Sequence, residues 1–337
     1  MGALNVPFAI LFVLLTVVGV LGNLIVIFAI AGDHKMRRSV MNILLLNLAI
    51  ADVSNLIVSL SEWISPVFFE NPQWLMPALF CPICRYLECL FLFASISTQM
   101  IVSIERYIAI VLPMQARHLC SRRNAIFAVM CSWIAVAIFS IPYAATHYVK
   151  KSGICTNAAA KRDWWQTYKL SEFLSFYFIP CIIIVCVYAK IATVLWSKDP
   201  RLSSETRTCV EKKYKKNDAL GMRRNVVKML IACVAVYFVC YSPIQVMFLS
   251  KAIFNISIHP PYDFILLLNA LAMTCSASNP LLYTLFSTKF RRRLRTVLGC
   301  NARCGSTNGI QEKDLSKNYV SINTHSLNTK ASFFLAD

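Results

Sequence analysis

The chain has 337 residues, of which 57% are hydrophobic and only 15% are charged, and its mean hydropathy is +0.58. An ordinary soluble domain carries about 25% charged residues, so this balance excludes a soluble fold and predicts an all-α membrane protein. The formal net charge is +18. Because the basic clusters flank apolar stretches, this charge indicates contact with anionic membrane lipid and not with nucleic acid.

Seven apolar stretches account for most of the chain, and each is long enough to cross the hydrocarbon core as a helix. They cover residues 1–32, 39–61, 81–112, 124–146, 170–196, 225–249 and 262–286. Proline, glycine and charged residues gather between them. No connection is long enough for a second core, so residues 1–299 are predicted to form one seven-transmembrane helix bundle with a short terminal helix. Residues 300–337 are predicted to be a disordered cytoplasmic tail.

Lysine and arginine concentrate in alternate connections and in the carboxyl-terminal region. By the positive-inside rule, these segments are cytoplasmic and the amino terminus lies outside, as in a multi-pass plasma membrane protein. After the seventh span, Phe290, Leu294 and Leu298 recur at helical spacing among arginines. This pattern predicts a short amphipathic helix on the inner leaflet.

Fourteen cysteines could suggest a framework of several disulfides, but on this topology most of them fall inside the spans or on the reducing side. Cys81 begins the third span at its outer end, and Cys155 lies in the outer loop after the fourth span. Both are in the oxidising compartment, so a disulfide between them is predicted. Cys84, one helical turn below Cys81, is the rival partner for Cys155.

Two further kinds of modification are candidates. Asn255 begins the sequon Asn255-Ile256-Ser257 on a short outer loop, so it is a possible glycosylation site. Cys300 and Cys304 follow a run of arginines next to the membrane, where cysteines are candidates for palmitoylation. The alternative for this pair is two free cytoplasmic thiols.

The third span carries charges that a membrane helix rarely tolerates. Arg106 follows Glu88 by a whole number of turns at about 3.6 residues per turn, and Ser95 and Gln99 lie close to the same line. A polar stripe therefore runs along one face of this helix and must point into the bundle or into a water-filled cavity. The alternative is that the stripe serves only as hydrogen-bonding contact between helices.

Enzyme and transporter functions find little support. The five histidines lie in connections or in the tail without metal-ligand spacing, at positions His34, His118, His147, His259 and His325. No catalytic constellation is apparent, so the chain is predicted not to be an enzyme and to require no cofactor. A transporter, which internal repeats with broken helices would favour, remains a remote alternative.

Short motifs in all seven spans carry a resemblance. They are Gly22-Asn23, Leu48-Ala49-Ile50-Ala51-Asp52, Glu105-Arg106-Tyr107, Trp133, Pro180 with Tyr188, Phe238 with Pro243, and Asn279-Pro280-Leu281-Leu282-Tyr283. Each motif alone is weak, but their order and placement together are specific. The chain therefore resembles the rhodopsin-like G-protein-coupled receptors.

The resemblance assigns roles in activation. It implies that Glu105 holds Arg106 at rest and releases it when the sixth helix swings outward to admit a heterotrimeric G protein. The other residues assigned to activation and coupling are Tyr107, Tyr188, Phe238, Pro243, Asn279, Pro280 and Tyr283. Serines and threonines in the tail suggest a receptor kinase and an arrestin as further partners.

The resemblance also implies a buried polar cluster, which in relatives can hold an allosteric sodium ion. Its members here are Asp52, Ser95, Ser276 and Asn279. An isolated aspartate at mid-membrane is costly, so a cation or a proton is expected there on physical grounds as well. Cys275 stands where many relatives have asparagine, which weakens the case for sodium more than the case for the cluster.

The ligand is predicted to be an extracellular basic peptide, because the chain looks most like the neuropeptide branch of these receptors. Glu88, Glu172 and Glu62 are expected to face an outer cavity, with Tyr241 in place of the usual tryptophan beneath it. The alternative is that Arg85, three residues earlier on the same helix, pairs with Glu88 and neutralises it. A biogenic amine receptor that uses Glu88 as the amine counter-ion is the main functional alternative.

Overall fold

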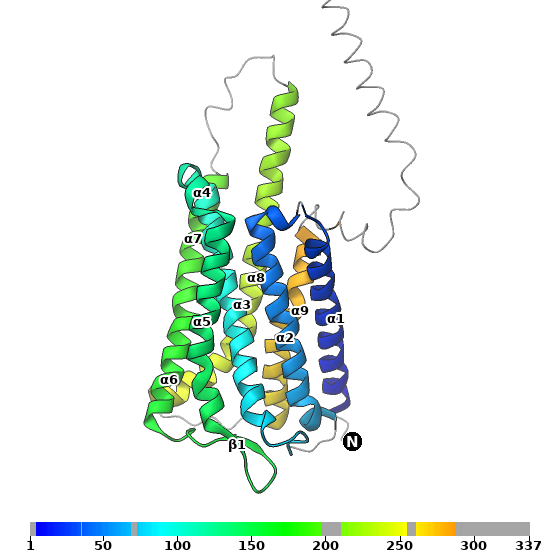
Figure 1. Ribbon diagram of the computed structural model, residues 1–337, viewed down its shortest axis with the longest axis vertical. Coiled ribbons are helices and arrows are strands. Elements are labelled where there is room, and N and C mark those ends of the chain that lie inside the picture. The colour runs from blue at the N-terminus through cyan, green and yellow to red at the C-terminus, as the bar shows by residue number, and fades with distance from the viewer. Residues whose placement is uncertain are drawn as a thin grey trace, which may run out of the picture. The chain divides into compact units, whose positions relative to one another are not determined.

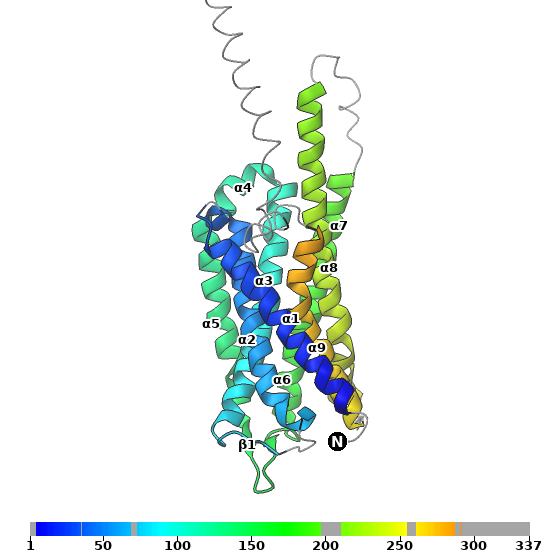
Figure 2. The same ribbon diagram turned by 90° about the vertical axis from the view of Figure 1, so that its right-hand side faces the viewer.

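The computed structural model describes residues 5–34, 36–68, 73–196, 210–254, 261–286 and 291. Within these ranges, seven helical segments are long and apolar enough to cross a membrane, which confirms the predicted bundle (Figures 1 and 2). The spans are α1 (Asn5–Ala31), α2 (Val40–Phe68), α3 (Phe80–Val111), α5 (Arg122–Thr146), α6–η2–α7 (Asp163–Phe173, Leu174–Phe178 and Ile179–Trp196), α8 (Val210–Phe254) and α9 (Tyr262–Phe286). Short helices η1 (Met36–Arg38) and α4 (Pro113–Leu119) connect α1 to α2 and α3 to α5.

An antiparallel hairpin of β1 (His147–Val149) and β2 (Cys155–Asn157) closes the outer end of the bundle. It lies at the same end as the first described residues, whereas α4 and the extension of α8 lie at the opposite end (Figure 1). A Cys81–Cys155 disulfide ties β2 to the start of α3. The predicted pairing is thus confirmed, and the rival Cys84 is a buried free thiol.

Two spans begin earlier than their apolar stretches. The fifth span starts at Asp163, not at residue 170, and α8 starts at Val210, not at residue 225. In both places polar turns extend the helix beyond the hydrocarbon, and hydropathy alone does not detect such turns. The outer loop is therefore shorter than predicted, and Lys169 lies inside a helix.

Pro180 explains the π-helical turn η2 in the middle of the fifth span. A proline has no N–H to donate to the carbonyl of residue 176 and its ring crowds that carbonyl. The chain accommodates this with a wider turn, a feature that is frequent at functional sites. The freed carbonyl of Phe176 accepts a hydrogen bond of 2.9 Å from the Tyr237 hydroxyl of α8.

Asparagine side chains join the helices within the membrane. Asn47 of α2 donates to Thr98 of α3 at 2.7 Å and accepts from the indole of Trp133 of α5 at 2.9 Å. Asn23 of α1 donates to the carbonyl of Ser276 of α9 at 3.0 Å. Because no water competes in hydrocarbon, these bonds fix which helices are neighbours.

Several predicted features lie outside the described residues. They are Asn255, Cys300, Cys304, the tail, and all of the predicted amphipathic helix except residue 291. The glycosylation, palmitoylation and tail assignments therefore stay predictions.

Gly19 offers a test of helix packing. A Cβ at this position would lie 2.9 Å from the Ala277 Cβ and 3.0 Å from its Cα, so Gly19→Ala forces α1 away from α9. We expect the free energy of unfolding to fall by about 1 to 3 kcal/mol and the thermal midpoint of the detergent-solubilised protein to fall with it. Gly221→Ala is the matched control, because its Cβ meets no atom within 4 Å. Equal midpoints for the two variants would contradict the packing.

Candidate ligand cavity and transmembrane switch

A cavity of about 330 Å³ opens at the outer end of the bundle, beneath the β hairpin. Side chains from α2, α3, α5, α6, α8 and α9 line it, together with residues of the hairpin and of η2. This is the same end as the amino terminus, so the cavity faces the extracellular side.

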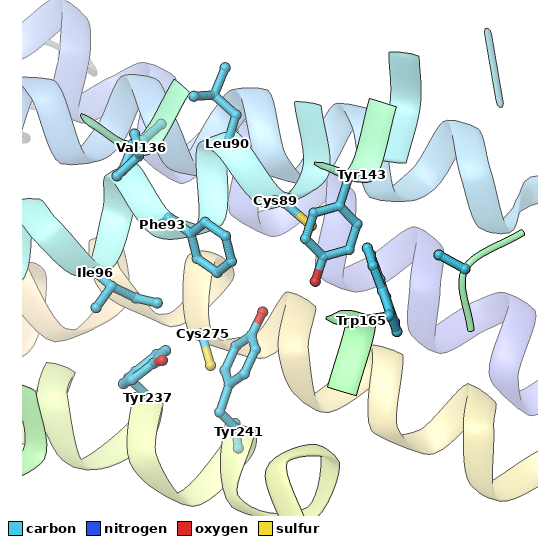
Figure 3. Packing of buried hydrophobic residues seen from close by; sticks show 14 residues of the cluster. Cys89, Leu90, Phe93, Ile96, Val136, Tyr143, Trp165, Tyr237, Tyr241 and Cys275 are labelled. Carbon is cyan, nitrogen blue, oxygen red and sulfur yellow. The ribbon is translucent and has the colours of Figure 1, made fainter. Parts of the chain in front are cut away.

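Aromatic rings form the inner wall of the cavity. Phe93 of α3 stacks on Phe176 with ring centroids 4.1 Å apart, and Tyr237 stacks on Tyr241 at 5.0 Å. Figure 3 shows the hydroxyl groups of Tyr143 and Tyr241 turned toward the same space. The site is thus a pocket with an aromatic wall that also presents charged and amide side chains, a combination that is typical of ligand sites.

Arg85 joins two of the three predicted acids. Its guanidinium forms an ion pair with Glu62 of α2 and a longer contact of 3.3 Å with Glu88, one turn further along α3. The Glu62 side chain is only 3% exposed, whereas that of Glu88 is 22% exposed. Glu88 lines the cavity and Glu62 does not. The expectation that Glu62 joins the cavity acids is therefore wrong, because Arg85 holds it against α3.

The third acid, Glu172, belongs to a buried network. Lys169 donates to Glu172 and to the Tyr143 hydroxyl, each at 2.7 Å, and Tyr143 donates to Glu172 at 2.5 Å. The Lys169 ammonium also lies 4.2 Å from the centre of the Phe248 ring of α8. This network connects α5, α6 and α8 at the cavity wall.

His147 lines the cavity from the hairpin. Its Nδ1 lies 2.8 Å from the Tyr143 carbonyl, so this nitrogen carries the proton and donates. Partial burial lowers the pKa of His147 to about 4. The ring is therefore neutral at physiological pH and adds no charge to the cavity.

The sequence did not point to Lys169, His147 or Trp165 as parts of the cavity. Lys169 stands three residues before Glu172, a spacing that signals an ion pair once residue 163 is known to begin a helix. No sequence signal reports that the hairpin brings His147 over the pocket, because the disulfide and the strand register determine its position.

Below the cavity, the structure brings the predicted polar cluster together. Asp52 of α2 accepts hydrogen bonds from Ser95 of α3 at 3.0 Å and from Asn279 of α9 at 2.7 Å. Ser276 accepts from Asn55 at 3.3 Å, so Asn55 also belongs to the cluster, although no sequence motif indicated it.

The cluster offers the oxygen donors that a hard cation prefers. The carboxamide oxygens of Asn55 and Asn279 are buried and accept no hydrogen bond from the described residues. Together with the Asp52 carboxylate, they make the residues present compatible with a sodium ion.

At the inner end, Glu105 and Arg106 form the expected ion pair, with a second hydrogen bond of 2.6 Å from Nη2 of Arg106. Tyr188 of α7 is buried and hydrogen-bonds Ser103 at 3.1 Å. The remaining predicted switch residues are Tyr107, Phe238 and Pro243, which are half-buried, and Asn279, Pro280 and Tyr283, which are buried.

An outer cavity, a buried polar core and an inner arginine pair within seven membrane helices define a transmembrane signalling receptor. A family model described as "7 transmembrane receptor (rhodopsin family)" matches residues 22–283. The chain therefore belongs to this family, the rhodopsin-like G-protein-coupled receptors, and is a multi-pass plasma membrane protein and not an enzyme.

Three relatives place the chain more closely. It is 61% identical to neuropeptide receptor 15 of Caenorhabditis elegans, over 98% of this chain and 99% of the relative. It is 29% identical to the allatostatin-A receptor of Bombyx mori, over 84% and 77% of the two chains. It is 25% identical to galanin receptor 2a of Danio rerio, over 91% and 82%.

The buried Lys169–Glu172 pair yields a prediction. Lys169→Met leaves Glu172 buried without its cation and should destabilise the protein by about 3 to 5 kcal/mol. The double variant Lys169→Met with Glu172→Gln removes both charges and keeps an acceptor for Tyr143, so it should recover most of this loss. Thermal midpoints of purified protein provide the measurement, and Lys161→Met, at an exposed lysine, is the control. A double variant as unstable as the single one would refute the ion pair.

Proposed function

We propose that this chain is a receptor for an extracellular peptide with an essential basic group, which binds beside Glu88 and activates a heterotrimeric G protein. The relative with 61% identity is named as a neuropeptide receptor, and this favours a peptide over an amine. The observation that supports an essential basic group on the ligand is the accessible carboxylate of Glu88. Its contact with Arg85 is long, at 3.3 Å.

Charge balance supports the same proposal. The outer cluster has three acids, Glu62, Glu88 and Glu172, and two bases, Arg85 and Lys169, so the acids outnumber the bases by one. Glu62 and Glu172 each have a close cation, so the excess is centred on Glu88. A ligand guanidinium can bind this carboxylate in bidentate fashion, which makes arginine a better match than lysine.

The aromatic wall suits the rest of a peptide. Trp165, Phe248 and Tyr241 surround the charged edge and offer apolar area for neighbouring side chains. An amine ligand would use Glu88 alone and leave most of this wall without contact. This difference makes the amine hypothesis the weaker of the two.

Sodium and cytoplasmic regulation complete the proposal. Asp52, Ser95, Ser276 and Asn279 would hold a sodium ion that favours the resting state, as the donor chemistry of the cluster supports. Phosphorylation of the tail by a receptor kinase would create an anionic ligand for arrestin.

A peptide screen tests the ligand class. Cells that express the receptor would be exposed to amidated peptides and to biogenic amines, with calcium and cyclic AMP measured in parallel. We expect activation by peptides that contain arginine. Activation by amines alone would refute the peptide proposal.

The role of Glu88 has its own test with the most potent peptide of that screen. Glu88→Gln should lower its potency by about ten- to a thousand-fold, because losing one partner of such a pair commonly costs about 2 to 5 kcal/mol. The exposed Asp163→Asn, which lies outside the cavity lining, is the matched control.

Replacing the arginine of the peptide with citrulline should lower its potency on the wild-type receptor. On the Glu88→Gln receptor, the same replacement should cause little further loss of potency. Equal losses on both receptors would place the basic group elsewhere, even if the ligand is a peptide.

A further inference from the structure

The hairpin above the outer cavity carries two polar side chains that form a pair. His147 of β1 lies opposite Asn157 of β2, and both line the cavity. The neighbouring pair in the ladder is hydrogen-bonded, since the Ala158 N–H donates to the Thr146 carbonyl at 2.8 Å. Because hydrogen-bonded and non-hydrogen-bonded pairs alternate in an antiparallel ladder, His147 and Asn157 form a non-hydrogen-bonded pair, in which side chains approach most closely.

The disulfide determines which face of the hairpin is directed into the bundle. Cys155 stands two residues before Asn157, so the two side chains lie on the same face of β2. The Cys155 sulfur is bonded to Cys81 at the start of α3. The face that carries His147 and Asn157 is therefore directed toward α3 and the cavity.

The His147 ring offers a hydrogen-bond acceptor to the cavity. Its Nδ1 donates to the Tyr143 carbonyl at 2.8 Å, so Nε2 of the neutral ring carries a lone pair and no proton. Partial burial lowers the pKa of His147 to about 4, which keeps the ring neutral. Within the described part of the chain, Nε2 has no hydrogen-bond partner, and it is open to solvent. The rings of Tyr143 and Trp165 hold the imidazole in place, with centroids 5.8 and 6.2 Å from it.

The Asn157 carboxamide offers the complementary donor. Its Oδ1 accepts from the Ala159 N–H at 2.6 Å, which fixes the orientation of the amide and leaves the N–H groups of Nδ2 for other partners. Among the described residues, Nδ2 donates to none, and it is also open to solvent. An acceptor and a donor thus stand next to each other at the mouth of the cavity, and the hairpin holds both.

The two groups match the main chain of an extended peptide. In an extended strand, the N–H and the C=O of one residue point to the same side, so one residue can donate to Nε2 and accept from Nδ2. The N–H and the C=O of a single trans peptide bond point in opposite directions and do not fit in this way. A terminal carboxamide presents both groups on one edge. The hairpin, however, lies at the mouth of the cavity, where the segment that leads toward Glu88 passes.

We propose that His147 and Asn157 bind the N–H and the C=O of one residue of the peptide agonist and hold that residue extended beneath the hairpin. The inference rests on the proposed function, since it requires a peptide, and it adds a contact that does not depend on the ligand's side chains. Main-chain hydrogen bonds of this kind supply affinity, whereas the Glu88 carboxylate and the aromatic wall select the peptide's sequence.

Receptor variants test the pair with the most potent arginine-containing peptide of the screen. His147→Asn preserves a donor for the Tyr143 carbonyl but removes Nε2, so potency should fall about three- to tenfold, the effect of one hydrogen bond. His147→Gln retains an acceptor that reaches as far as Nε2 and should lose less. Tyr148→Phe is the matched control, because Tyr148 lies on the opposite face of β1, is 45% exposed and does not line the cavity. Surface expression is measured for every variant.

Ester substitution in the same peptide identifies the main-chain groups. An ester replaces one N–H by oxygen without added bulk. At one residue, this change should lower potency about three- to tenfold on the wild type and on Tyr148→Phe, but cause little further loss on His147→Asn. An ester at the following bond weakens the carbonyl of that residue as an acceptor. Its effect should disappear on Asn157→Asp, which keeps the acceptor for the Ala159 N–H and removes the donor.

Three results would overturn the inference. They are full potency of every ester on the wild type, equal losses on the wild type and on His147→Asn, and sensitivity confined to a terminal carboxamide. If Glu88→Gln weakens the agonist while the hairpin variants leave its potency unchanged, the proposed function stands and this inference alone fails. Activation by amines alone would overturn both.

Discussion

The pairing of buried ionisable groups inside the bundle is the constraint on which the rest of this structure depends. An unpaired ion within apolar helices costs several kcal/mol, so such groups persist only with partners. Here the partners come mostly from neighbouring helices or turns: Arg85 with Glu62, Lys169 with Glu172, and Asp52 with Asn279. The first and third of these pairs hold α3 and α9 to α2, the second belongs to the network that joins α5, α6 and α8, and Glu88 is left as the acid with the loosest partner.

A second set of polar contacts joins α8 to the fifth span, from the outer cavity to the inner end. Tyr237 and Tyr241 line the cavity on α8, and Tyr237 hydrogen-bonds the carbonyl that the π-helical turn sets free. The hydroxyl groups of Tyr177 and Ser242 share a hydrogen bond of 2.6 Å, one residue before Pro243. At the inner end, Arg224 holds α8 to α7 through the Leu195 carbonyl at 2.6 Å.

A ligand that displaces the cavity tyrosines would change the bonds between η2 and α8, and Pro243 gives α8 a point at which to bend. The outer and inner sites are then two ends of one bundle with two arrangements, which is the physical requirement for allostery.

Sequence patterns predicted the features that follow from local chemistry. Hydropathy located the seven spans, compartment chemistry selected Cys81 and Cys155, and helical spacing aligned Glu88 with Arg106. The features that sequence patterns did not predict depend on tertiary packing. Lys169 lies in a polar helical extension outside the apolar stretch, so hydropathy did not place it on a helix. The pairing of Arg85 with Glu62 depends on how α2 packs against α3, which local sequence does not report. Pro180 in the sequence accounts for the π-helical turn. Nothing in the sequence indicated that Tyr237 of α8 would donate to the carbonyl that this turn sets free.

Coupling between the two ends of the bundle is the central claim, and reciprocity tests it most directly. The purified receptor in nanodiscs, without G protein, would be titrated with the most potent peptide agonist for both the wild type and Glu105→Gln. If Glu105 holds Arg106 in the resting arrangement, its neutralisation favours the active one, and agonist affinity should rise by a factor within about 5 to 150. Unchanged affinity alongside raised basal nucleotide exchange, measured on adding G protein, would contradict a single bundle with two arrangements.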